Sequence, residues 1–386
     1  MSRFPNIPEP KLVDIDYDAD LASLKNRYQD GTGHYPGIND PETFHLEQIA
    51  YEKNELKLLI NDESKQNLLP FARDERLDNI GALVDCTRLD ESNALTVLQF
   101  SFNTHSSFVI PKGYQVMAID GATAFETIDD VIVDASTASA QTTAQCTIAG
   151  VDGNGFTPGQ INQPIVTMPE IASVTNTTTS QGGAPIEGDD AYAERIFLAP
   201  SSFSVCGPYD AYKYFALSAN PAIKDVAVIN PAPNEIELCA ILSDGSLPDK
   251  AIKDQILAAC SGKKRVPMGD LVSMIDAESV TATATFSLEI FKDYASFADS
   301  IKTTAQQRIQ ERINKWAVTF GQDIVPDALA SLAQSIEGVS LARKTITDSA
   351  GAIITDRKSI GASQRPEITI TSFDFIVIAE TSEGGI

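Results

Sequence analysis

The sequence has few of the residues from which disulfide frameworks, zinc sites and membrane spans are built. Its five cysteines stand singly and in odd number, so they cannot form a complete set of intramolecular disulfides. The three histidines, His34, His45 and His105, are too far apart for a short-spaced zinc pair. No apolar run reaches the roughly 20 residues that span a bilayer, and the first residues lack the apolar core of a signal peptide. We therefore expect folding in a reducing, cytosolic compartment and no membrane as partner.

Positive charge is also scarce. The 386 residues include 29 Lys and Arg against 53 Asp and Glu, a net charge of −24. Nucleic-acid affinity depends on cationic side chains that displace counterions from phosphates, so the composition argues against nucleic acid as a partner. The one basic cluster, Lys263 to Arg265, is expected to be a solvated turn or an ion-paired patch. Partners should instead present basic or apolar surfaces.

Familiar catalytic motifs are missing as well. The chain has neither a G-x-S-x-G nucleophile elbow nor a phosphate-binding G-x-x-x-x-G-K-[ST] loop. Residues 152–155, DGNG, resemble the start of a calcium loop but lack its twelve-residue pattern, so we expect an Asx-type turn and predict no metal or cofactor. A glycan hydrolase that uses paired carboxylates is an alternative. Its acids would be Glu187, Asp189, Asp190 and Glu194.

The N-terminal region reads as helical. Residues 1–10 are rich in proline and predict an extended arm, and a helix follows from Lys11 until Gly31 and Gly33 end it. A longer helix should begin near Asp40, with Pro41 at its first position, and reach about residue 69. Its narrow apolar stripe predicts helical partners from another chain, with an intrachain hairpin as the alternative. The stripe comprises Leu46, Ile49, Leu56 and Ile60.

The hydrophobic period then changes from helical to alternating. Residues 71–92 predict one more helix, with Leu77, Ile80 and Leu83 inward. From Ala94, apolar residues alternate, and short strands separated by Gly, Asn, Asp and Pro turns indicate an antiparallel β-domain up to about residue 170. The strands expected after the first are Phe108–Ile110, Tyr114–Ala118, Val131–Val133 and Ala144–Ala149.

A glycine-rich junction runs from Gly150 to Arg195. Closely spaced glycines permit positive φ and close approach of backbones, and the polar run 176–180 predicts surface loop. The acids at 189 and 190 precede a helical pattern, where we expect one of them to cap free N–H groups. The junction would act as a pivot between domains.

The rest of the chain alternates between helices and strands. We expect a helix begun by Pro208, strands at 223–229 and 235–242, and a helix over 249–260. A strand at 280–290, two helices and two more strands complete the chain. The last strand, 367–379, is long and apolar, so it is either an inner strand or an intermolecular edge. At such an edge Ile376 and Ile378 would make contact.

The predicted fold class is α+β with several domains: long N-terminal helices, an antiparallel β-domain, then α+β domains toward the C-terminus. The four predicted segments are a helical region at 1–92, a β-rich domain with the junction at 93–200, an α+β domain at 201–280 and a C-terminal α+β domain at 281–386, a candidate for dimerisation.

The junction holds an ordered set of residues that recurs in a known family: Gly150, Gly153, Asn154, Gly159, Ile161, Ser173, Val174, Asn176, Gly182, Gly183, Glu187, Asp189, Tyr192, Arg195 and Ile196. Three further motifs agree in order, namely IPKG at 110–113, GPYDAYKYFALSA at 207–219 and VPMGD at 266–270. On these residues the chain resembles the baseplate J-like proteins of contractile phage tails, from about Leu77 to the mid-300s. Where the family pattern has an Arg-Pro pair, this chain has Arg265, Val266 and Pro267.

The resemblance implies a structural, non-enzymatic wedge subunit of a baseplate, without cofactor, folded and assembled in the bacterial host cytoplasm and carried in the virion tail. Two copies would join one copy of a second wedge protein through an N-terminal helical bundle, and six such units would surround the hub. Sheath-initiator and tail-fibre proteins would be further neighbours. A host-surface binding module, such as a fibre, is another alternative, although the sequence shows none of the repeats typical of fibres.

Overall fold

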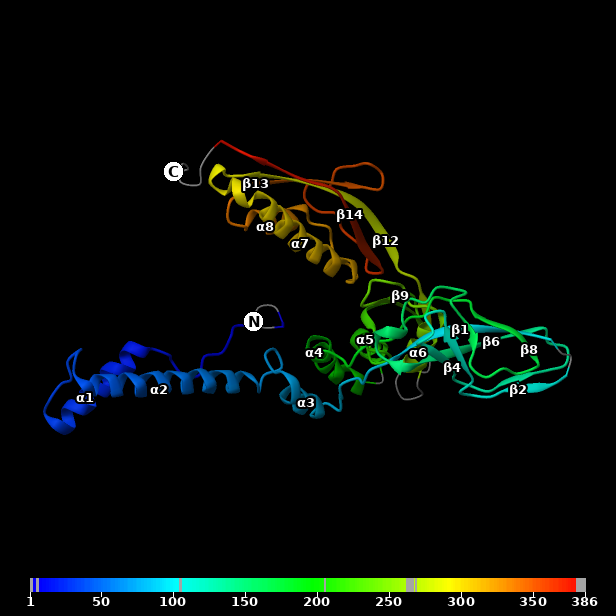
Figure 1. The fold of residues 1–386 in the computed structure, drawn as a ribbon, viewed down its shortest axis with the longest axis horizontal. Helices are drawn as coiled ribbons and strands as arrows, with labels where there is room; N and C mark the ends of the chain where they lie inside the picture. Colours follow the sequence, from blue (N-terminus) through cyan, green and yellow to red (C-terminus); the bar gives the residue numbers. More distant parts are fainter. Residues whose placement is uncertain are drawn as a thin grey trace. The chain divides into compact units, whose positions relative to one another are not determined.

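The structure is a computed structural model that describes residues 3–4, 7–103, 106–204, 206–261, 267 and 269–379. His105 and the basic cluster at 263–265 lie outside the described residues, as does part of the VPMGD motif. The chain forms two compact units. The first consists of Met1–Arg88 and Gly188–Ala199, and the second of Leu89–Glu187 and Pro200–Ile386. Figure 1 labels most of the helices and strands in chain order.

The first unit is helical. Its elements are α1 (Tyr17–Thr32), α2 (Pro41–Lys65), α3 (Asp74–Ala82) and α4 (Asp189–Leu198). The side chain of Asp16 accepts a hydrogen bond from the Ala19 N–H and so caps α1, which ends at Gly33 with φ at 74°. Pro41 occupies the first turn of α2, as predicted.

Polar residues hold α1 against α2. The buried positions of α2 are Thr43, Ala50, Asn54 and Asn61. The carboxylate of Asp20 on α1 forms ion pairs with Lys53, at 2.8 Å, and with Lys57. It also accepts a hydrogen bond from the Asn54 amide at 3.1 Å. Farther along α2, the side chain of Asn61 pairs with the backbone of the N-terminal arm at Leu12 and Val13. The inner face of this hairpin is therefore polar, and its apolar residues lie elsewhere.

Three helix predictions in this unit were wrong. The helix expected from Lys11 begins only at Tyr17. α2 ends at Lys65, four residues earlier than expected, and the helix expected over 71–92 is only the nine-residue α3. Leu83 is 83% exposed, not inward. The reason is that the chain leaves the helix at this point: Cys86 N–H bonds back to the carbonyl of Gly81, and Asp85 takes a positive φ of 53°.

The second unit begins with a nearly closed antiparallel barrel. Its sheet has the order β7-β3-β4-β6-β1-β8, and a separate two-stranded sheet pairs β2 with β5. A core of Leu98, Phe100, Val116 and Phe125 fills the interior. The strands are β1 (Asn93–Phe102), β2 (Phe108–Ile110), β3 (Gln115–Ala118), β4 (Ala124–Thr127), β5 (Val131–Val133), β6 (Ser139–Ala149), β7 (Ile161–Pro164) and β8 (Ile171–Asn176), with a 3-10 turn η1 (Val151–Gly153) before β7.

A small α+β segment follows. β10 pairs antiparallel with β9 and parallel with β11, and the helices α5 and α6 pack together. Pro208 precedes α5, as the sequence predicted. The side chain of Asp249 caps α6 by accepting a hydrogen bond from the Ile252 N–H. The elements are η2 (Ala199–Phe203), α5 (Tyr209–Leu217), β9 (Ile223–Ala232), β10 (Glu235–Leu242), α6 (Lys250–Cys260) and β11 (Leu271–Ile275).

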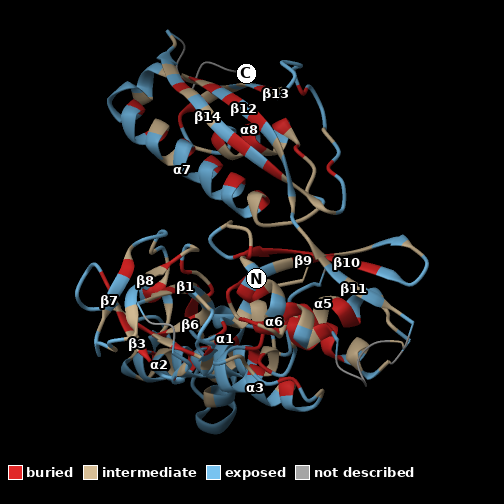
Figure 2. Cartoon of the chain, turned by 90° about the vertical axis from the view of Figure 1, so that its right-hand side faces the viewer, coloured by how far each residue is buried: buried red, intermediate tan, exposed pale blue. Residues whose placement is uncertain are grey.

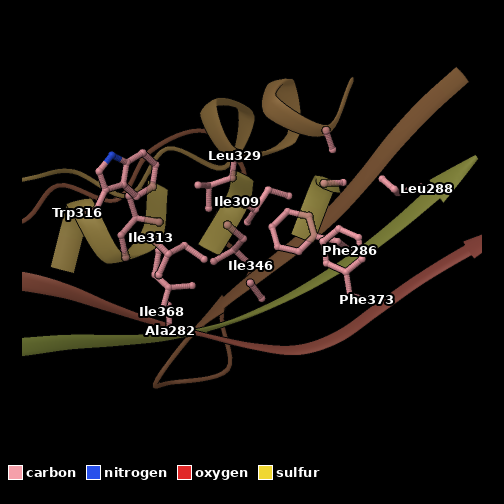
Figure 3. Packing of buried hydrophobic residues seen from close by; sticks show 14 of the residues in the cluster. Ala282, Phe286, Leu288, Ile309, Ile313, Trp316, Leu329, Ile346, Ile368 and Phe373 are labelled. Carbon is pink, nitrogen blue, oxygen red and sulfur yellow. The ribbon is translucent and has the colours of Figure 1, made fainter. Parts of the chain in front are cut away.

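The C-terminal segment is a three-stranded sheet with two helices on one face. The strand order β13-β12-β14 places the last strand at an edge, parallel to β12. Buried residues run along β12 and β14 (Figure 2), and they meet Ile309, Ile313, Trp316 and Leu329 from α7 and α8 (Figure 3). The elements are β12 (Glu278–Ile290), η3 (Lys292–Phe297), α7 (Ala298–Ala317), α8 (Pro326–Gln334), β13 (Val339–Asp348) and β14 (Gln364–Val377).

The predicted fold class is therefore confirmed: N-terminal helices, then an antiparallel near-barrel sheet, then α+β elements.

Trp316 is the single tryptophan of the chain and lies in this C-terminal core, so its fluorescence reports on that segment. Ile309→Ala should lower the free energy of unfolding by roughly 2–5 kcal/mol, because it opens a cavity at a fully buried position. Urea unfolding followed by Trp316 fluorescence measures the change. Gln306→Ala, on the exposed face of the same helix, should change it by less than about 0.5 kcal/mol. Equal effects of the two variants would contradict the packing.

Asp20 should make the helical hairpin sensitive to acid. Hydrogen bonds from Lys53 and Lys57 lower the pKa of the Asp20 carboxyl. Its stabilisation of the hairpin is therefore present above its unfolded pKa and lost as the pH falls through the lower, folded pKa. At about pH 5, Asp20→Asn should be cut by pepsin within α1 much faster than the parent chain, and the ratio of the two rates should approach one well below the folded pKa. Asp18→Asn, an exposed neighbour, should match the parent throughout.

Candidate functional site

The glycine-rich junction closes the barrel where its strand pairing runs out. β7 and β8 lie at opposite ends of the sheet order, and the side chain of Asn176 joins them. Its Oδ1 accepts from the Ile161 N–H at 2.9 Å, and its Nδ2 donates to the carbonyls of Phe156 (3.3 Å), Thr157 (3.0 Å) and Thr178 (2.8 Å). The Gly159 N–H reaches the Asn176 carbonyl at 3.0 Å. Because Asn176 is buried, loss of its side chain would leave one N–H and three carbonyls without their present partner.

A second asparagine fixes the loop that follows. The amide of Asn154 pairs with the backbone of Gly183 in both directions, donating to its carbonyl at 2.7 Å and accepting from its N–H at 2.9 Å. Gly183 must be a glycine here, since a Cβ would lie 2.2 Å from the carbonyl oxygen of Gly150. The buried Ser180 adds a bond of 2.6 Å from its hydroxyl to the carbonyl of Gly153.

The same loop joins the barrel to the segment after α5. Gly182, with φ at +87°, packs so closely that a Cβ would lie 2.8 Å from Cδ1 of Ile252 on α6. Its carbonyl accepts from the hydroxyl of Ser92 at 2.7 Å and from the amide of Asn220 at 3.2 Å. Asn220 is buried, and its Oδ1 accepts from the Ala222 N–H at 2.8 Å. In the sequence, Asn220 and Pro221 predict only the end of the preceding helix, and the contact of Asn220 with the junction was not predicted.

Glu187 closes the second unit. Its carboxylate accepts from the Leu89 N–H at 3.0 Å, and its own N–H donates to the Leu89 carbonyl at 3.0 Å. The residue is buried. The carboxylate therefore helps to join the two ends of the segment Leu89–Glu187, with which the second unit begins.

Arg195, in the first unit, anchors α4 to the loop after α3. Its Nη2 donates to the carbonyl of Thr87 at 2.6 Å, and its guanidinium lies 5.7 Å from the ring centre of Tyr192. The Tyr192 hydroxyl donates to the Cys86 carbonyl at 2.7 Å, and burial raises the pKa of Tyr192 to about 12. Its ring packs against Gly81, where a Cβ would lie 2.1 Å from the hydroxyl oxygen.

The prediction that Asp189 or Asp190 caps α4 was wrong. Gly188 is the N-cap residue, and no side chain caps this helix. The two carboxylates are occupied elsewhere: Asp189 pairs with Arg88 at 2.8 Å and Asp190 with Arg3 at 2.7 Å. Burial raises the pKa of Asp189, but hydrogen bonds from the Asp74 N–H and Arg88 outweigh it and leave the pKa below its ordinary value. Both acids still complement the helix dipole.

The apolar stripe predicted on α2 lies largely in solvent. Ile49, Leu56 and Ile60 are exposed and Leu46 is partly buried. A second exposed row was missed, comprising Phe44, Tyr51 and Leu58, which recur every seven residues. At about 100° per residue, the two rows flank the polar face that packs on α1. The seven-residue spacing of this row is present in the sequence. It was overlooked because the residues between the two rows, which form the buried face, are mostly polar.

At the C-terminus, Ile376 lies on the sheet face that carries no helix. It stands opposite Glu289 of the central strand β12, and Glu289 stands opposite Leu341 of β13. Ile376 is 55% exposed, whereas Ile378 is partly buried and its N–H donates to the carbonyl of Ile290 at 2.9 Å. The outer edge of β14 has no partner strand among the described residues.

Other candidate groups were also placed. The five cysteines are all thiols outside any disulfide. His34 contacts Asp40 at 3.1 Å, and His45 is exposed on α2. Within the described residues, no cluster of three or more His, Cys, Asp or Glu is arranged to hold a metal ion. In the same part of the chain, no helix combines the length and apolar character needed to cross a membrane.

Asn176→Asp should loosen the barrel seam, the place where the Asn176 side chain joins β7 to β8. The variant keeps the acceptor for Ile161 but loses three donated hydrogen bonds and places a charge among carbonyl oxygens, a cost of about 1–3 kcal/mol or more. Hydrogen exchange at Gly159 and Ile161 should become at least about tenfold faster. Asn103→Asp makes the same chemical change at an exposed position of the same domain, and exchange should stay at the parent rate. Unchanged exchange in Asn176→Asp would refute the seam.

Comparisons with known proteins find matches to three parts of the chain. Models of the baseplate J-like proteins match residues 39–94 (N-terminal domain), 97–183 (barrel domain) and 204–276 (central domain). No curated protein sequence matches the chain. A solved structure titled "Cryo-EM structure of the anti-feeding prophage (AFP) baseplate, 6-fold symmetrised" is similar at 12% identity and a TM-score of 0.39, over 94% of this chain and 95% of that one. Since the three matched domains together span more than half of the sequence, the chain belongs to the baseplate J-like family.

Proposed function

We propose that this chain is a structural wedge subunit of a contractile tail baseplate or a related injection machine. A structural baseplate role follows from the family. Beyond that role, we infer that the chain assembles through α2 and β14 into a ring around the hub, in the virion tail. The ring would hold one arrangement until fibre engagement shifts it and releases the sheath, because packed interfaces switch between discrete states.

The observation that carries the proposal is the distribution of side chains on α2. Its buried face is polar and contacts α1 and the N-terminal arm, whereas two rows of large apolar residues are left in solvent. Apolar rows that recur at heptad spacing are typical of helices that pack against other helices. Because one row lies on each side of the α1 contact, a helix from a partner chain fits on either flank. We propose a second copy of this chain and a second wedge protein as these partners.

The edge of β14 offers a second contact. Fourteen residues of this strand, Gln364–Val377, have one edge without a partner strand among the described residues. Soluble proteins normally protect such edges with lysine, proline or a bulge. Here there is a register shift near Thr371 and Pro366 at the start, but no lysine or arginine after Arg365 within the strand. We propose that the C-terminal segments of two copies pair along this edge, with Ile376 at the contact.

The acidic residues that an enzyme would need already have structural partners. Glu187 binds the Leu89 backbone, while Asp189 and Asp190 form ion pairs with arginines. A carboxylate whose pKa is lowered by such a partner, as for Asp189, is a poor proton donor near neutral pH. These contacts favour the structural role over glycan hydrolysis.

Ile49→Asp and Leu56→Asp test the bundle. Each places a charge where the proposal buries an apolar side chain, so incorporation into tail particles should fall by on the order of tenfold or more. Gln48→Asp adds the same charge at the exposed position next to Ile49 and should assemble normally. Quantitative mass spectrometry of purified particles measures incorporation, and Trp316 fluorescence with circular dichroism checks that each free chain is folded. Normal incorporation of both stripe variants would refute the bundle.

A further inference from the structure

The barrel domain carries a small ribbon that its own sheet does not use. Strands β2 and β5 pair only with each other among the described residues, and β2 lies at the margin of the barrel in Figure 1. In their register, Val109 stands directly opposite Ile132. These two side chains point outward, 47% and 77% exposed, while Ile110 and Val133 are buried. The ribbon thus presents an apolar cross-strand pair to solvent.

The domain around this pair is nearly free of positive charge. Between Leu89 and Glu187 the sequence has ten Asp and Glu, one lysine and no arginine. Lys112 is that lysine. Such a domain repels acidic surfaces and attracts basic ones before any close contact is made.

Three of the acids bracket the ribbon. Asp129 and Asp130 precede β5, and Asp134 follows it directly. All three are exposed. The backbone N–H of Lys112 donates to Oδ1 of Asp130 at 2.7 Å, which holds that carboxylate at the end of β2. Ile132 is therefore an apolar centre flanked along its strand by three carboxylates, and Lys112, the one lysine of this domain, lies just after β2.

We propose that the outer face of the β2–β5 ribbon is a docking site for a cationic segment of another baseplate protein, one that carries an apolar side chain between lysines or arginines. The apolar pair supplies the desolvated centre of the contact, and the acids select the sign of the partner's charge. A second copy of this chain does not fit, because its corresponding face bears the same negative charge. This inference rests on the proposed structural role in the baseplate.

Site-specific photo-crosslinking in assembled tails tests the site. A benzoylphenylalanine at position 132 of the full chain should cross-link to a different tail protein, through a peptide with a net positive charge. Cross-links to an acidic or neutral peptide, or to a second copy of this chain, would overturn the docking site. The same probe at position 49 is the control, because cross-linked products there show that the chain is in its assembly. The docking site would also be overturned if position 49 gave products and position 132 gave none. Tails that never contain the parent chain would overturn the proposed function itself.

Charge reversal provides an independent measurement. Asp129→Lys with Asp134→Lys should lower incorporation into tails by at least about tenfold, and raised salt should weaken incorporation of the parent chain. Asp90→Lys with Glu91→Lys changes the net charge of the same domain equally at exposed positions outside the ribbon and the junction, so incorporation should stay within about twofold. Equal losses in the two double variants would show a non-specific effect of net charge and overturn the site, as would normal incorporation of the first.

Discussion

The second unit depends on asparagine amides, two of them buried, that replace backbone pairing where strands run out. Asn176 joins the two ends of the barrel sheet, Asn154 pairs with a loop backbone in both directions, and Asn220 ties that loop to the segment after α5. An amide has both a donor and an acceptor, so one side chain satisfies a carbonyl and an N–H together. These contacts bring backbone segments close together. At position 183 there is no room for a Cβ, so the residue there must be glycine.

Much of the fold could be predicted because local signals agreed with the final packing. Pro41, Gly33 and Pro208 start or end helices where the structure has them, and the alternation of 280–290 marks a strand with one buried face. The failures share a physical cause. Leu83 follows a helical pattern, but tertiary contacts of the loop through Cys86 end the helix first. Parallel pairing, as of β12 with β14, is set by contacts remote in sequence.

The candidate site was found in outline but not in its chemistry. Glycine spacing and asparagines at 154 and 176 located the junction, yet no sequence pattern says which carbonyls those amides reach. The capping role expected of Asp189 failed because two arginines distant in sequence attract its carboxylate. On α2, the stripe of Ile49 and Leu56 was visible, whereas the polar inner face depends on a partner, Asp20, that lies on another helix.

Asn154 precedes Gly155, the pairing in which an asparagine amide is most readily lost by ring closure onto the next backbone nitrogen. Here that nitrogen donates to the Ser180 carbonyl at 2.8 Å, and the amide itself is held by Gly183. The succinimide ring therefore cannot form until both contacts open. We therefore expect loss of the Asn154 amide to require opening of this loop, so that deamidation would record how often the loop opens.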